Sequence, residues 1–103
     1  MVKELTTTDF KSTIQEGVTI VDFWASWCGP CLSMAPIFEQ TSTEMKNKAT
    51  FAKVEVDQHQ ELAGEYGVQG IPTLIVFKDG KEVTRLVGLQ EKDAIVQAVE
   101  QAQ

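Results

Sequence analysis

The chain has 103 residues, of which 43% are hydrophobic and 23% charged, and this length and composition predict a single domain over residues 1–103. Nine basic against fifteen acidic side chains give a net charge of −6, which disfavours nucleic acid as a partner because phosphate binding needs clustered lysine and arginine. No apolar run reaches the roughly 20 residues that span a bilayer, and no secretory signal is visible at the start of the chain.

The first part of the chain predicts a strand, a helix and a second strand. A short strand is expected over residues 2–5, and a helix should begin after Thr8 as its N-cap and end at Gly17. The near-continuous apolar run over residues 19–25 is typical of a central strand that is covered on both faces.

A long helix is expected next, from residue 28 to about residue 47. Pro36 lies inside it and should kink it, because proline removes a backbone donor and clashes with the preceding turn. Residues 51–56 indicate another strand, and a short helix over residues 61–66 should end at Gly67.

The last part of the chain predicts a hairpin and a closing helix. Residues 73–78 and 82–87 should pair, since Asp79-Gly80 is a preferred two-residue turn. The final helix is expected over residues 91–102, with a weakly marked start because Gln90 is a poor N-cap. The element order predicts an α/β fold of three layers, in which a parallel sheet, made mixed by the terminal hairpin, is flanked by helices.

The motif Trp27-Cys28-Gly29-Pro30-Cys31 lies where a predicted strand gives way to a helix, and it contains the only two cysteines of the chain. Cysteines three residues apart at a helix start can close a disulfide within one turn and so cycle between dithiol and disulfide. The first lies at the helix N-terminus, where free N–H groups and the helix dipole favour a thiolate. This asymmetry predicts Cys28 as the nucleophile and Cys31 as the resolving cysteine.

The cysteine pair has two other interpretations. A structural zinc site needs four ligands, whereas the chain offers two cysteines and one distant histidine, His59, so no metal is expected. An inert pair in the core is disfavoured by the Gly29-Pro30 dipeptide and by the strand-to-helix position. No glycine-rich phosphate-binding motif is present, and the chain therefore has no predicted nucleotide site of its own.

Three separated segments resemble those of the thioredoxin family, and their spacing matches over the whole chain. These segments are Val21-Asp22-Phe23-Trp24-Ala25-Ser26-Trp27-Cys28-Gly29-Pro30-Cys31, Gly70-Ile71-Pro72-Thr73 and Phe77-Lys78-Asp79-Gly80. The resemblance implies the thioredoxin fold and a protein-disulfide reductase that works by dithiol–disulfide exchange. Gly29 and Pro30 match the dipeptide that, in this family, favours a reductase over an oxidase or isomerase.

The resemblance also assigns two charged side chains to the site. Asp22 matches a buried aspartate that assists deprotonation of the resolving cysteine, and a carboxyl inside an apolar strand should have a raised pKa because it loses hydration. The alternative is an aspartate at a strand end that reaches water. Lys53 matches the lysine that faces this aspartate, and its alternative is an ordinary solvated strand residue.

Further matched positions face the cysteine pair or form a docking surface for substrates. Pro72 matches a cis-proline, although the sequence alone would give only a low expectation of a cis bond. The docking positions are Trp27, Gly70, Ile71, Val87 and Gly88. Trp27 and Val87 could instead be core residues and the glycines turn residues, while Trp24, Met34 and Met45 are expected to be ordinary core packing.

Leu32 is the one clear departure from the family pattern, which usually has lysine or arginine after the second cysteine. The change removes a cation near the active-site helix and should expose an apolar side chain beside the docking surface. It leaves the redox assignment unchanged but affects the expected thiol pKa and the choice of partner.

The resemblance implies an electron carrier with no bound cofactor. Electrons would come from a separate thioredoxin reductase and pass to proteins that contain disulfides. We expect a cytoplasmic monomer that binds neither nucleic acid nor membranes. A different class of function, a redox-silent subunit that grips a partner enzyme through the same surface, stays open at this stage.

Overall fold

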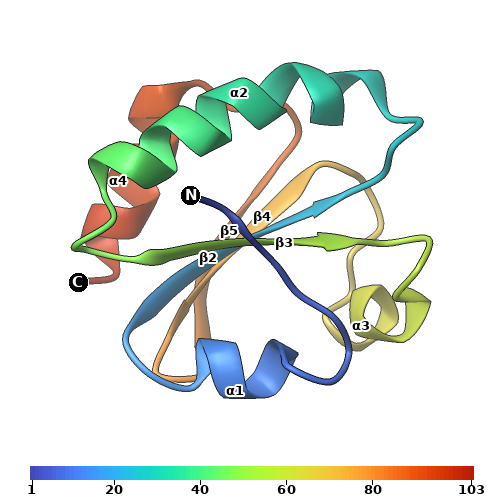
Figure 1. Ribbon diagram of the computed structural model, residues 1–103, viewed down its shortest axis with the longest axis horizontal. Coiled ribbons are helices and arrows are strands. Elements are labelled where there is room, and N and C mark those ends of the chain that lie inside the picture. Colours follow the sequence, from blue (N-terminus) through green and yellow to red (C-terminus); the bar gives the residue numbers. More distant parts are fainter.

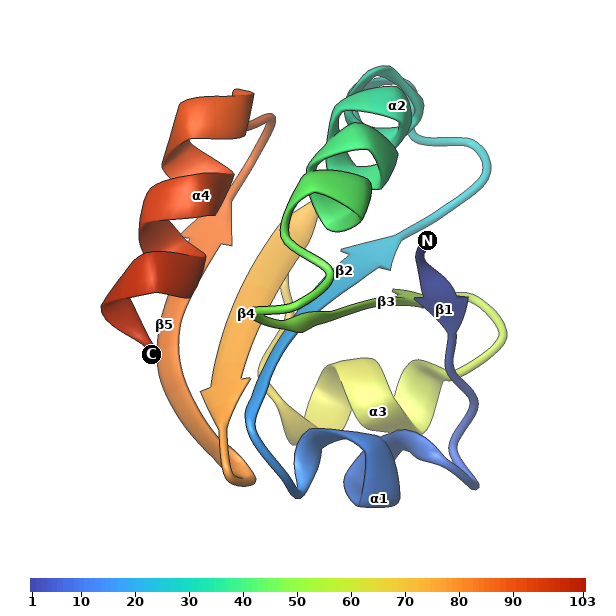
Figure 2. The same cartoon turned by 60° about the vertical axis from the view of Figure 1, so that its left-hand side comes forward.

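Five strands form one mixed sheet in the computed structural model, which describes all residues from 1 to 103, and the strand order is β1-β3-β2-β4-β5. The strands are β1 (Lys3–Glu4), β2 (Val18–Trp24), β3 (Thr50–Glu55), β4 (Thr73–Lys78) and β5 (Lys81–Val87). The helices are α1 (Phe10–Ile14), α2 (Gly29–Glu44), α3 (Gln60–Glu65) and α4 (Lys92–Gln101). Helices α2 and α4 cover one face of the sheet and α1 and α3 the other (Figure 1, Figure 2).

The sheet is parallel on one side of β2 and antiparallel on the other. β3 pairs in parallel with both β1 and β2, whereas β4 runs antiparallel to β2, and β5 runs antiparallel to β4. The three-layer α/β architecture with a mixed sheet is therefore confirmed. None of the helices is both long and apolar enough to cross a membrane.

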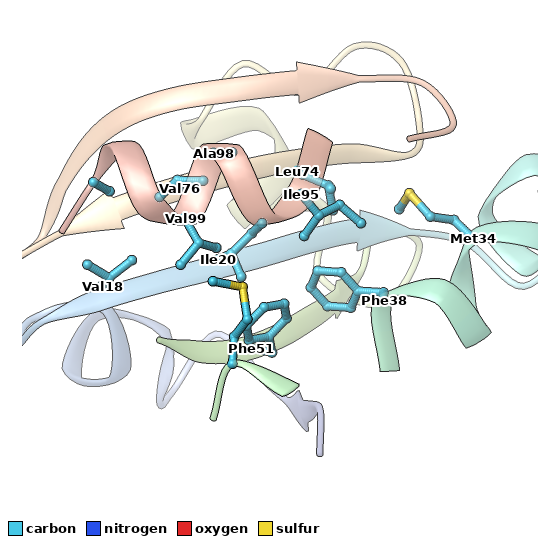
Figure 3. Packing of buried hydrophobic residues seen from close by; sticks show 12 residues of the cluster. Val18, Ile20, Met34, Phe38, Phe51, Leu74, Val76, Ile95, Ala98 and Val99 are labelled. Carbon is cyan, nitrogen blue, oxygen red and sulfur yellow. The ribbon is translucent and has the colours of Figure 1, made fainter. Parts of the chain in front are cut away.

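Side chains alternate along β2 between two separate cores. Val18 and Ile20 join the cluster under α2 and α4, where the rings of Phe38 and Phe51 lie 5.1 Å apart (Figure 3). On the other face, under α1 and α3, Phe10 packs against the rings of Phe23, Tyr66 and Phe77. Phe10 and Ile14, four positions apart on α1, are both buried on this side of the sheet. Because both faces of β2 are covered, six of its seven residues are buried.

The predicted elements are all present, but three helix boundaries were wrong. The first helix ends at Ile14, with Gln15 as its C-cap, and not at Gly17. Thr8 is not the N-cap of the first helix. Asp9 occupies that position, and its carboxylate accepts a hydrogen bond from the Thr6 N–H instead of capping the helix. The second helix ends at Glu44 and not near residue 47, because Met45 leaves the helical conformation and the Lys48 N–H bonds back to the Met45 carbonyl.

The hairpin turn has the predicted conformation. Asp79 and Gly80 both have positive φ angles, of 50° and 88°, as a two-residue turn of this type requires. The Asp79 N–H also donates to the Gly17 carbonyl at 2.9 Å, and the Gly17 N–H donates to the Asp79 carboxylate at 2.8 Å. These two hydrogen bonds join the hairpin to the start of β2, at the end of the sheet away from the cysteine motif (Figure 1).

Ile95 anchors α4 to the sheet and gives a test of this packing. It is fully buried in the cluster under α2 and α4, so Ile95→Ala should lower the free energy of unfolding by about 2–5 kcal/mol. Gln97→Ala, at an exposed position on the same helix, should change it by less than about 0.5 kcal/mol. Urea denaturation of both variants measures the difference, and equal stabilities would contradict the packing of α4 against the sheet.

Candidate active site

Cys28 and Cys31 form a disulfide at the first turn of α2, with their Cα atoms 5.2 Å apart. Cys28 is the N-cap of the helix and has extended backbone angles, while Gly29 and Pro30 occupy the first helical positions. Proline suits this place because N–H groups in the first turn have no partner inside the helix. Both cysteines are nearly covered, with 5% and 2% of their surfaces exposed.

The helix terminus directs a hydrogen-bond donor at one sulfur only. The Cys31 N–H points at the Cys28 Sγ over 3.2 Å, whereas the Cys28 sulfur also lies 3.9 Å from the carbonyl oxygen of Ile71. An N–H group and the positive end of the helix dipole both favour a negative charge at this sulfur. The environment therefore differs between the two cysteines in the direction expected for an attacking Cys28 thiolate.

Asp22 lies on β2 below the active-site helix, with only 4% of its surface exposed. Its Oδ1 atom has no hydrogen-bond partner. Burial raises the pKa of this carboxyl to about 7, and the charge of Lys53 opposes the rise without cancelling it. The expected direction of the pKa shift is confirmed, and the alternative of a water-exposed aspartate at a strand end is wrong.

The Asp22 carboxyl and Cys31 open onto the same cavity, of about 390 Å³, between β2, β3 and α2. The cavity therefore connects a carboxyl buried on the sheet with a cysteine at the start of α2. Its wall is formed by Val2, Asp22, Trp24, Cys31, Leu32, Ala35, Pro36, Phe38, Glu39 and Lys53. Leu32, the departure from the family pattern, is half-exposed at this wall, as expected for an apolar residue beside the site.

Lys53 faces Asp22 across the sheet, but the two side chains do not form an ion pair. The residues are aligned in the β2–β3 register, and both line the cavity. None of the five ion pairs in the structure includes Lys53. Its Nζ instead lies over the Trp24 ring, 5.1 Å from the centroid. Trp24, expected to be ordinary core packing, is in fact a half-buried part of the cavity wall.

The predicted docking positions lie around the cysteine pair. Trp27 and Val87 are exposed to 69% and 63%, so the alternative that they are core residues is wrong. Gly70 lies beside Val87, because a Cβ atom on Gly70 would meet the valine side chain at an ordinary contact distance of 3.7 Å. The Ile71–Pro72 peptide bond is cis, as the resemblance implied. The Gly88 N–H donates to the Pro72 carbonyl at 2.8 Å, which joins the two loops beside the cysteines.

Two side chains near the site are not marked by the sequence. Asp57, which follows β3, accepts a hydrogen bond of 2.7 Å from the Trp27 Nε1 and so orients the exposed indole. Leu89, 54% exposed, adds an apolar side chain after Gly88. Nothing local in the sequence indicates that Asp57 is the partner of a side chain thirty positions away.

No group of three or more His, Cys, Asp or Glu side chains is placed to hold a metal ion. Met34 and Met45 are buried in the cluster under α2 and α4, which confirms their expected role in packing.

Comparison with known proteins identifies the family. The family model described as Thioredoxin matches residues 1–101. A thioredoxin from Staphylococcus aureus is 42% identical over 99 residues, which cover 96% of this chain and 95% of that protein. The structure of a mutant thioredoxin from Halobacterium salinarum NRC-1 aligns with a TM-score of 0.90 at 37% identity, covering 97% of this chain and 88% of that one. The structure of Plasmodium falciparum thioredoxin also gives a TM-score of 0.90, at 36% identity, and the alignment covers 99% of this chain and 100% of that one.

The chain belongs to the thioredoxin family. Its fold and its Cys28–Cys31 disulfide are those of a thiol–disulfide oxidoreductase, and its activity is that of a protein-disulfide reductase.

Asp22→Asn should stabilise the fold at neutral pH. The carboxyl has a pKa of about 7 in the folded chain against an ordinary 3.8, so between these values the folded state holds a proton that the unfolded state has released. The stability of the unsubstituted chain should therefore fall as the pH rises from about 4 to about 7 and level off above. The Asn variant lacks this decline and should gain about 1–4 kcal/mol above pH 7, on a scale of 1.36 kcal/mol per pKa unit.

Urea denaturation of the disulfide form at several pH values checks this expectation. The two proteins should be similar in stability at the acid end of the series and should diverge toward neutral pH. An Asn variant that is less stable at neutral pH would mean that the fold stabilises the carboxylate more than its burial destabilises it.

Proposed function

We propose that Cys28 is the nucleophile and Cys31 the resolving cysteine in the reduction of protein disulfides. The observation that carries the assignment is the Cys31 N–H directed at the Cys28 sulfur, at the start of α2. A donor and a helix dipole at one sulfur lower the cost of its thiolate, and the thiolate is the attacking species.

The reaction passes one electron pair through a mixed disulfide. In the dithiol form, the Cys28 thiolate attacks one sulfur of the substrate disulfide and forms a new S–S bond with it. The S–S bond of the substrate breaks, and the first substrate thiolate leaves and takes up a proton. Cys31 then loses its proton and attacks the Cys28 sulfur. The bond between Cys28 and the substrate breaks, and the second substrate sulfur leaves as a thiolate that takes up a proton. The chain then holds the Cys28–Cys31 disulfide.

Asp22 is the base that accepts the Cys31 proton in this proposal. Its support is the shared cavity, together with a carboxyl pKa raised by burial to about 7, where the group can both take up and release a proton near neutral pH. Lys53, Gly29, Pro30 and Pro72 are supporting residues. They shape the cavity and the cysteine turn without exchanging protons themselves.

The docking surface is formed by the exposed indole of Trp27, the Val87 side chain and the backbone of Gly70, Ile71 and Gly88. Its apolar character suits both a substrate protein and the thioredoxin reductase that returns the electrons, since each must bring a sulfur to Cys28. The chain acts as a single-domain monomer over residues 1–103, and it works without a bound cofactor. We place the reaction in the cytoplasm, where thiols are kept reduced.

The order of attack can be tested with serine variants. Cys31→Ser should keep a reactive Cys28 and accumulate a stable mixed disulfide with an oxidised protein substrate, because the resolving thiol is missing. Cys28→Ser should form no such adduct and should lose disulfide reduction. Mass spectrometry of each variant after incubation with the same substrate gives the result. Adducts on Cys31 in the Cys28→Ser variant, with none in the reciprocal case, would reverse the roles.

The docking surface can be tested with two valines on the same strand. Val87→Asp places a charge in the apolar rim and should raise KM for a protein disulfide about tenfold, a loss of about 1.4 kcal/mol of binding, with little change in kcat. Val83→Asp, at another exposed position of β5, is the matched control and should leave KM unchanged. Equal effects of the two changes would argue against a local docking role for Val87.

A further inference from the structure

The wall of the cavity beneath the active-site helix includes one cation, Lys53, and three groups that could bind it, which are the carboxyls of Asp22 and Glu39 and the ring of Trp24. Asp22 and Trp24 are two residues apart on β2, so they project from the same face of the sheet. Lys53, aligned with Asp22 on the neighbouring strand, is the only lysine or arginine in the cavity wall. Its ammonium group lies over the Trp24 ring at 5.1 Å from the centroid and not in an ion pair with the carboxylate.

We infer that Trp24 is a positioning residue whose ring holds the Lys53 ammonium away from the Asp22 carboxyl, and so keeps Asp22 free to exchange a proton. The inference rests on the proposed role of Asp22 as the base for Cys31. Trp24 packs against the cluster of Ala25, Cys28 and Cys31, and its proposed effect on proton transfer is exerted through Lys53.

An ammonium group in direct contact with Asp22 would stabilise the carboxylate and hold it ionised. A carboxyl held in that state is a weak acceptor for the Cys31 proton. The face of an indole offers the ammonium an alternative electrostatic partner that carries no titratable proton of its own. Lys53 can therefore stay inside the cavity without fixing the protonation state of its neighbour.

The Trp24 indole also carries an unused donor. Its Nε1 is buried and has no hydrogen-bond partner, which is a cost that a leucine or phenylalanine at the same position would avoid. Packing against Ala25, Cys28 and Cys31 uses the apolar surface of the ring but leaves this donor without a partner. The property that tryptophan adds over these residues is the strongest cation-binding ring face among the side chains.

Other groups that face Asp22 supply no second cation. From α2 come Cys31 and Glu39, neither of which can carry a positive charge, and the exposed Met1 ammonium that pairs with Glu39 at 3.7 Å is not part of the cavity wall. From β4 comes Leu74, which is aligned with Asp22 and is apolar. The electrostatic balance at Asp22 is therefore set by burial and by the position of Lys53.

The test is a titration of the Asp22 carboxyl carbon by NMR in the disulfide form, in which the cysteines do not titrate. Trp24→Leu should lower the Asp22 titration midpoint by roughly one pH unit, because Lys53 is released toward the carboxyl. Trp24→Phe keeps a ring and should retain most of the original midpoint. The same Trp24→Leu change made together with Lys53→Met should produce no shift relative to Lys53→Met alone.

This last comparison separates the proposal from a structural effect. A smaller side chain at Trp24 could also admit water and lower the midpoint, but that effect would persist without Lys53. A shift that persists in the Lys53→Met background, or an unchanged midpoint in Trp24→Leu, overturns the proposal.

The unsubstituted protein gives an independent measurement. Protons on the Lys53 Cε should be displaced upfield by the Trp24 ring current below the Asp22 midpoint, and the absence of that displacement also overturns the proposal. None of these readouts uses turnover. The base role of Asp22 is judged separately by the exchange rate of Asp22→Asn, so the two claims can fail independently.

Discussion

The burial of β2 on both faces is the constraint on which the other features depend. Packing by α2 and α4 above and by α1 and α3 below fixes this strand at the centre of the sheet and removes water from the Asp22 carboxyl. The same strand ends four residues before Cys28, which is the N-cap of α2. One packing arrangement thus sets the sheet, the charge state of the buried carboxyl and the position of the reactive sulfur.

The order and type of the elements could be predicted because they depend on local patterns. The apolar run of β2, the Asp79-Gly80 turn and the strand-to-helix motif each carry their signal within a few residues. Helix ends were less predictable, since several residues can cap a helix. Thr8 and Asp9 are both good capping residues by type, and the bond from the Thr6 N–H to the Asp9 carboxylate is visible only in the structure.

The features of the candidate site also fall into those with a local sequence signal and those that depend on contacts between distant residues. The proposed cysteine roles rest on a helix start, and the raised pKa of Asp22 rests on an apolar strand, and both patterns are visible in the sequence. The pairing of Trp27 with Asp57 and the placement of Lys53 over Trp24 depend on contacts between separate elements. No periodicity or spacing encodes such contacts, and the cis bond before Pro72 was expected only from the family resemblance.

The near-complete burial of the cysteine pair also determines how the protein behaves among other thiols. Little of either cysteine is exposed in the disulfide form, so a small thiol has little surface of the pair to approach. On the proposed docking surface, a protein bound against Trp27 and Val87 would bring its own sulfur close to Cys28. Since access is among the factors that set rates of thiol–disulfide exchange, such docking would favour exchange with bound proteins over exchange with small thiols. Burial of the disulfide would in this way make its reduction depend more on a bound protein partner than on the surrounding pool of small thiols.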